Sequence, residues 1–217
     1  GRNMGSDAPW MSKAVRSNGG SAGELEVSFR TTGRRKPLQS GPEPLLSIRC
    51  MKLLALETSA ETASVALLTG DRLLHREGGT PGTHARFVLG WVEALLEEGG
   101  CALAEIDVIA GSVGPGGFTG RLLALSVAQG LAVAADLPLI AVPTLHALAF
   151  GRGDGLHLCC MDARMSEVYS QACEVRGDAV IARSEVRVGA PGDLSPPPGE
   201  PAQWQACGSG FALPATQ

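Results

Sequence analysis

Residues 51–77 read MKLLALETSAETASVALLTGDRLLHRE, and this stretch decides the fold. Residues 52–57 form a short apolar run that predicts a buried strand, and residues 63–68 predict a second one. The Gly70-Asp71 turn then leads into a third strand over residues 72–77. Three strands joined by short turns predict an antiparallel meander.

Helices and strands alternate after the glycine-rich break at residues 78–82. Thr83, Thr119 and Thr144 each precede an apolar segment and are expected to act as helix N-caps, and Gly99-Gly100 is expected to end the first helix. The expected elements are helices over residues 83–98, 119–135 and 144–150, and strands over residues 107–113 and 137–142. The order βββαβαβα predicts an α/β fold, a mixed sheet with helices on its faces, as in ribonuclease H-like folds.

The chain divides into three segments by composition. We expect a first domain over residues 51–150 and a partial second domain over residues 151–217, whose expected strands are residues 156–163, 167–175 and 180–187. Residues 191–201 are proline-rich, and the second domain looks incomplete because the helices of a second repeat do not follow. Residues 1–50 read as a disordered leader or an upstream extension, with Met51 as a possible start of the functional protein.

Charge and cysteine usage narrow the classes of function. Residues 1–50 carry a net charge of +4 and residues 51–217 a net charge of −8, so the body is a poor nucleic-acid binder on its own. No apolar run reaches membrane-spanning length without Gly, Pro or charge nearby, which favours a soluble, cytoplasmic protein. The six cysteines have neither zinc-site nor disulfide-framework spacing, which favours reduced thiols.

The first two expected helices carry more apolar surface than one sheet can bury. On the helix over residues 83–98 the apolar side chains span an arc of roughly 200°, and the helix over residues 119–135 is apolar almost all round. Two interpretations remain open. The helices cover each other and the sheet, or they present a shared apolar face to another subunit.

The glycine loop of residues 111–120 resembles a phosphate-binding loop only in composition. It lacks the Lys-Ser/Thr end of a P-loop, and Thr119 stands where a dinucleotide fingerprint needs Gly. Weak anion binding at the following helix stays possible. Tight packing of strand against helix explains the same glycines without a ligand.

Two enzyme classes are alternatives for this chain. A metallopeptidase is disfavoured because the four histidines, His75, His84, His146 and His157, form no HExxH motif. A ribonuclease H-like nuclease needs several convergent carboxylates, and only Glu57 and Asp107 lie at strand ends. Glu57 could equally be a turn residue that bonds the backbone of residues 58 and 59.

Four motifs in fixed order identify a family resemblance. They are Met51-Lys-Leu-Leu-Ala-Leu-Glu-Thr-Ser59, Thr83-His84, Gly114-Pro-Gly-Gly-Phe-Thr-Gly120 and Met161-Asp-Ala-Arg-Met-Ser-Glu-Val-Tyr169. From residue 51 to about residue 210 the chain resembles the TsaB (YeaZ) family, the dimerisation subunits of the bacterial complex that makes threonylcarbamoyladenosine in tRNA. The resemblance implies an actin/Hsp70-like ATPase fold of two ribonuclease H-like domains.

The resemblance also implies a non-catalytic scaffold. A TsaD-type paralogue would transfer the threonylcarbamoyl group to the adenosine next to the anticodon of tRNAs reading codons that start with A. The implied partners are that paralogue, a TsaE-type ATPase and a second copy of the chain, with tRNA bound only within the complex and no membrane. No cofactor of its own is expected, since ATP and a metal would belong to the partner subunits. A metal-dependent hydrolase, either a glycoprotease-like peptidase or a ribonuclease H-like nuclease, is the alternative.

The resemblance also implies site residues, at the positions of this chain that match the family motifs. The implied partner interface is Thr83, His84, Phe87, Val88, Trp91, Val92, Leu95, Arg121, Leu122 and Leu125. The glycine loop, Gly114, Pro115, Gly116, Gly117, Phe118, Thr119 and Gly120, is expected to position the second helix for its partner. A possible nucleotide cleft comprises Glu57, Thr58, Ser59, Asp162 and Arg164, and no metal ligands are expected.

Three positions depart from the family pattern. Glu57 replaces the usual Asp, Gly117 replaces a Ser, and Arg121-Leu122 replaces Leu-Arg. A shift of one helical position turns a side chain by about 100°, which moves any partner contact of this arginine. A scaffold predicts loss of function when Trp91 or Leu95 becomes charged and little effect of Glu57→Ala, whereas a metal nuclease predicts the reverse.

Overall fold

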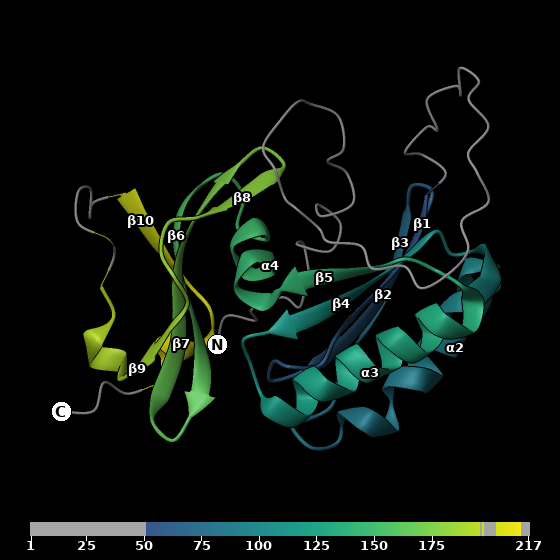
Figure 1. Cartoon of the computed structure of the whole chain (residues 1–217), viewed down its shortest axis with the longest axis horizontal. Coiled ribbons are helices and arrows are strands. Elements are labelled where there is room, and N and C mark those ends of the chain that lie inside the picture. The colour runs from purple at the N-terminus through teal and green to yellow at the C-terminus, as the bar shows by residue number, and fades with distance from the viewer. Residues whose placement is uncertain (1–50, 196, 198–202, 214–217) are drawn as a thin grey trace, which may run out of the picture.

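The computed structural model describes residues 51–195, 197 and 203–213 (Figure 1). The predictions for residues 1–50 lie outside this range. Two β sheets, with helices beside them, make up the described part of the chain.

The first sheet has the predicted mixed topology, with strand order β3-β2-β1-β4-β5. Strands β1 (Lys52–Glu57), β2 (Ala63–Thr69) and β3 (Arg72–Gly78) form the antiparallel meander. Strands β4 (Val108–Gly114) and β5 (Leu139–Pro143) add parallel to β1. The ribonuclease H-like order predicted from residues 51–150 is therefore confirmed.

The first helix begins later than the Thr83 cap predicted. A 3₁₀ turn, η2 (His84–Arg86), precedes α2 (Val88–Gly99), which ends at the left-handed Gly100 as expected. The Thr83 hydroxyl caps neither element, because it donates to the Thr80 carbonyl (2.8 Å) and accepts from the Thr80 amide (3.0 Å). The prediction of one continuous helix from Thr83 is therefore wrong at its start.

The other two threonine caps are also wrong. Helix α3 (Phe118–Ala135) has Gly117 at its N-cap, and α4 (Thr144–Phe150) has Pro143. Thr119 lies inside α3. Thr144 is the first residue of α4, where its side chain joins a buried polar cluster instead of bonding the helix backbone.

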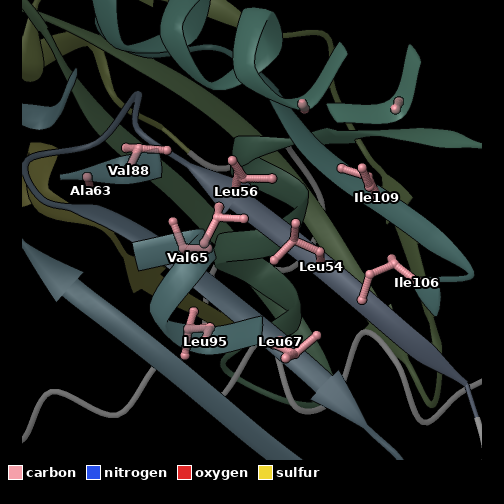
Figure 2. Close-up of a cluster of buried hydrophobic side chains, with 12 residues drawn as sticks. Leu54, Leu56, Ala63, Val65, Leu67, Val88, Leu95, Ile106 and Ile109 are labelled. Carbon is pink, nitrogen blue, oxygen red and sulfur yellow. The ribbon is translucent and has the colours of Figure 1, made fainter. Parts of the chain in front are cut away.

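Both α2 and α3 pack on the same face of the first sheet (Figure 2). Alternate residues of β1 and β2, such as Leu54 and Leu67, point to this face and are fully buried. Helix α2 adds Val88, Val92 and Leu95 to the cluster, whereas α3 buries only alanines, Ala124, Ala128 and Ala132. Their four-residue spacing places the alanines in one stripe. Leu123, Val127 and Leu131 pack beside that stripe and are partly buried against the same cluster.

The second sheet is built on a long hairpin of β6 (Gly155–Arg164) and β7 (Glu167–Arg176). Strand β10 (Trp204–Cys207) pairs parallel with β6 and was not predicted. The strand predicted over residues 180–187 is instead β8 (Ala179–Ala182) and β9 (Arg187–Gly189), both on β7. Ser184 lies between these two strands. Its hydroxyl accepts a hydrogen bond from the Ala172 amide, and its carbonyl accepts one from the Gln171 side chain.

Helix α4 packs on the second sheet through Leu145, Ala149 and Phe150, opposite several buried cysteines. All five cysteines of the described range are free thiols. Short 3₁₀ turns complete the described chain: η3 (Leu103–Glu105), η4 (Pro191–Asp193) and η6 (Ser209–Ala212).

Candidate partner interface and the polar cluster beside it

Large hydrophobic side chains are exposed on the outward sides of α2 and α3 and at their starts. Val133 is 83% exposed, Phe118 68%, Leu89 52%, Leu122 45% and Phe87 37%. On α3, Leu122 and Val133 fall on the side away from the alanine stripe, and Phe118 is the first residue of the helix. We call these five residues the outer apolar face.

The predicted interface residues divide between this face and the core. Val88, Val92 and Leu95 are almost fully buried beneath α2, and a charged Leu95 would therefore disrupt the core instead of testing an interface. Thr83, Trp91, Arg121 and Leu125 are half-buried. His84 is buried as well.

Leu89 and Val133 were missed by the sequence reasoning. The apolar arc of each helix was too wide to show which side meets the sheet. On α3, the alanines at a spacing of four residues could have shown which side faces the sheet, because a helix packs closely through small side chains.

Arg121 folds back towards the glycine loop. Its guanidinium lies 5.9 Å from the centre of the Phe118 ring, and its side chain lies against Gly114. Leu122 occupies the exposed position where the family pattern places arginine. The swap therefore replaces a charge on the outer apolar face with a hydrophobic side chain.

Helix α3 meets the length and composition of a membrane-spanning helix, and little of it is buried. It is also the crossover between the parallel strands β4 and β5, and it packs on β4. This arrangement is that of a soluble α/β domain, with an apolar helix surface left uncovered.

The glycine loop packs against the segment that follows β1. A Cβ atom at Gly116 would lie 2.7 Å from the Ser59 carbonyl oxygen, and one at Gly120 would overlap the Thr58 carbonyl. The Gly117 amide donates a hydrogen bond to the Ser59 carbonyl (2.8 Å). Of the two interpretations of these glycines, the structure supports close packing.

Residues 57–59 are buried and bonded to several elements at once. The Ser59 amide donates to Glu57 Oε1 (2.5 Å), the backbone-bonding role considered for Glu57. The His84 ring donates from Nδ1 to the Thr58 carbonyl (3.1 Å), and the Thr58 hydroxyl donates to the Gly120 carbonyl. This tripeptide therefore joins β1 to η2 and to α3.

Three hydroxyls gather beside the tripeptide, at the carboxyl ends of the central strands. The Oγ atoms of Ser59 and Ser112 and the Oγ1 atom of Thr144 lie 3.3–3.4 Å apart, and Thr144 also donates to Glu57 Oε2 (3.4 Å). The adjoining cavity has a volume of about 20 Å³ and a mostly apolar lining that includes Glu57 and Ser112. That space suits one water molecule and is too small for a nucleotide phosphate.

Asp162 and Arg164 lie at the end of β6, where they pair with each other. The Arg164 amide bonds Asp162 Oδ1 (2.6 Å), and its guanidinium bonds Oδ2 (2.8 Å) and approaches Glu61 (3.8 Å). This is the local ion pair considered from the sequence. Within the described range, no hydrogen bond or ion pair joins either residue to residues 57–59, so the five predicted cleft residues do not form one bonded group.

The residues considered for metal chemistry do not converge. Asp107 accepts from the Lys52 amide (2.7 Å) at the start of β1, whereas Glu57 lies at the end of that strand. Across residues 51–195, 197 and 203–213, no three His, Cys, Asp or Glu side chains are placed to hold a metal ion. His157 donates to the Gly153 carbonyl (2.8 Å), and burial lowers the pKa of His146.

Comparison with known proteins assigns the chain to a family. A model described as "TsaD: tRNA N6-adenosine threonylcarbamoyltransferase" matches residues 74–215. The structure of YeaZ from Pseudomonas aeruginosa is 37% identical, with a TM-score of 0.69 over 75% of this chain and 78% of that one. The chain belongs to the TsaB (YeaZ) family.

Curated relatives of the TsaB family agree with this assignment. The Haemophilus influenzae protein named tRNA threonylcarbamoyladenosine biosynthesis protein TsaB is 40% identical over 124 residues, which are 55% of this chain and 52% of that protein. A tRNA N6-adenosine threonylcarbamoyltransferase from Sphingopyxis alaskensis is 36% identical over 116 residues, covering 45% of this chain and 34% of that protein. The chain thus spans about half the length of the TsaB relative. The likeness to the YeaZ structure confirms the actin-like fold class predicted from the sequence.

Proposed function

We propose that the chain is a non-catalytic subunit of the system that makes threonylcarbamoyladenosine in tRNA. In this proposal it binds a TsaD-type partner through the outer apolar face and brings no catalytic site of its own. ATP and a metal ion belong to the partner subunits, a TsaE-type ATPase joins the pair, and tRNA is bound only by the assembled complex. The complex acts in the cytoplasm.

The outer apolar face is the observation that carries the proposal. Five large hydrophobic side chains are left partly or mostly in water on two neighbouring helices, and both helices are anchored to the sheet by other residues. Fully burying one such side chain stabilises a complex by about 1.5–3 kcal/mol, so covering these exposed parts would contribute several kcal/mol. Relatives with TsaB names and with transferase names both match the chain, which supports a partner of the paralogous type.

The remaining geometry favours a scaffold over a hydrolase. The carboxylate at the end of β1 is engaged by the Ser59 amide and the Thr144 hydroxyl, and the cavity beside it holds about one water. A second copy of the chain is a further occupant of the same face. In the proposal the homodimer and the heterodimer therefore compete.

The test is light scattering on a size-exclusion column, using the full chain alone and mixed with a purified tRNA N6-adenosine threonylcarbamoyltransferase. Leu89→Glu places a charge in the outer apolar face, and Val188→Glu is its matched control, a 58% exposed valine on β9. We expect wild type and Val188→Glu to form a one-to-one complex and Leu89→Glu to bind at least about tenfold more weakly. The proposal would be refuted if all three proteins bound the transferase equally, or if the wild type did not bind it.

A further inference from the structure

Thr58 links the two helices that carry the outer apolar face. It is 1% exposed, its carbonyl oxygen accepts from His84 Nδ1 (3.1 Å), and its hydroxyl donates to the Gly120 carbonyl. His84 begins the turn that leads into α2, because its own carbonyl accepts from the Phe87 amide (3.1 Å). Gly120 lies in the first turn of α3. One residue therefore bonds the entrance of each helix.

The residues on both sides of Thr58 are also held by hydrogen bonds. Glu57 Oε1 fixes the Ser59 amide (2.5 Å), and the Ser59 carbonyl accepts from the Gly117 amide (2.8 Å). Gly120 lies so close to the Thr58 carbonyl that no side chain fits between them. The backbone at residues 57–59 therefore cannot shift without moving the start of α3.

The bond from His84 has a fixed direction. A carbonyl oxygen only accepts, so Nδ1 carries the proton, and in the neutral ring Nε2 is left as an acceptor. Nε2 is buried, and none of the residues that the structure describes gives it a hydrogen-bond partner. Within the described part of the chain, the Thr58 carbonyl is therefore the one hydrogen-bond partner of the His84 ring. This bond fixes the ring and the turn that His84 begins.

Core packing holds the two helices on one sheet, with side chains of both in the same buried cluster. Helix α2 packs mainly on β2 and β3, whereas α3 packs mainly on β4 and β1. The strands that each helix mainly contacts therefore differ. The polar link through Thr58 adds a direct tie between the two helix starts.

We propose that Thr58 is a positioning residue that sets the placement of α2 relative to α3, and thereby the shape of the surface offered to a TsaD-type partner. This assignment rests on the proposed function for the identity of the partner. The link itself is a property of this chain and can be measured without the partner.

The binding test compares three variants of the full chain. Thr58→Val removes the hydroxyl at nearly constant volume, Thr58→Ser keeps it, and Ile109→Val is a control that trims a fully buried core residue with no part in the link. For each we measure the dissociation constant for the transferase by calorimetry and the stability by urea denaturation. We expect about tenfold weaker binding for Thr58→Val, and binding within about threefold of wild type for Thr58→Ser and Ile109→Val.

A partner-free measurement separates this assignment from the proposed function. Spin labels at Glu93→Cys and Gln129→Cys, with Cys50 and Cys101 replaced by serine, report the distance between α2 and α3. We expect Thr58→Val to broaden or shift this distance distribution and Thr58→Ser to restore it. An unchanged distribution in Thr58→Val, or binding that follows stability alone across the three variants, would overturn the positioning role. If Thr58→Val shows the expected distance effect but the wild-type chain does not bind the transferase, only the proposed function is refuted.

Discussion

Alanine should have opposite effects at two glycines of the same helix, Gly120 and Gly130. At Gly130 a Cβ atom meets nothing within 4 Å, so Gly130→Ala gains helix propensity without strain. The expected gain is about 0.4–1 kcal/mol, or roughly 1–4 °C in Tm for a domain of this size. At Gly120 the new Cβ overlaps the Thr58 carbonyl, which its neighbours hold in place.

The cost at Gly120 follows from that overlap. Overpacking against a fixed backbone typically costs about 1–3 kcal/mol, which exceeds the propensity gain of up to about 1 kcal/mol. Gly120→Ala should therefore lose on the order of 1–2 kcal/mol net, a fall in Tm of roughly 2–8 °C. Urea and thermal denaturation of dilute protein, followed by circular dichroism, measures both variants. Shifts of the same sign at both glycines would refute the packing argument.

Two further predictions concern titratable groups in the second sheet. Arg176 and Arg183 hold the pKa of Glu174 below its ordinary value, so this carboxylate stabilises the fold above the unfolded pKa of about 4.3 and loses that effect as pH falls below it. Glu174→Gln should thus show a shallower loss of stability than wild type in urea denaturation between about pH 5 and pH 3, and parallel curves would contradict this. Burial raises the pKa of the Cys160 thiol to about 11, and Cys159, Cys173 and Cys207 are buried as well. Ellman's reagent should therefore leave these four thiols unmodified until the chain is denatured, and rapid modification of all six cysteines in the native chain would show that this core is open.

Periodicity predicted the first sheet because its signals are local. The apolar runs of β1 and β2 and the Gly70-Asp71 turn determine a meander without long-range information. The threonine caps were wrong because a hydroxyl at a helix start has other partners, as Thr80 shows for Thr83 and the buried cluster shows for Thr144. The partner of Thr83 is local and competes with the helix backbone, whereas the partners of Thr144 come from distant parts of the chain and leave no local pattern.

The candidate site was only partly predictable for a similar reason. The sequence indicated too much apolar surface on two helices, and it named residues 57–59 and the glycine loop. It did not show that Thr58 bonds both helix starts, since His84 is 26 residues away and Gly120 is 62. It also placed Leu95 on the interface, because a wide apolar arc does not reveal which side faces the sheet.

The alanine stripe of α3 gives this helix two sides that differ in side-chain size and hardly at all in polarity. Hydropathy therefore says little about the orientation of α3, whereas side-chain size indicates it: the fully buried side chains are alanines, and Phe118, Leu122 and Val133 are exposed. Because the exposed residues are separate from the buried ones, Phe118, Leu122 and Val133 can be redesigned as polar side chains with the core left intact. Such a variant should stay folded, and under the proposed function it should no longer bind a partner.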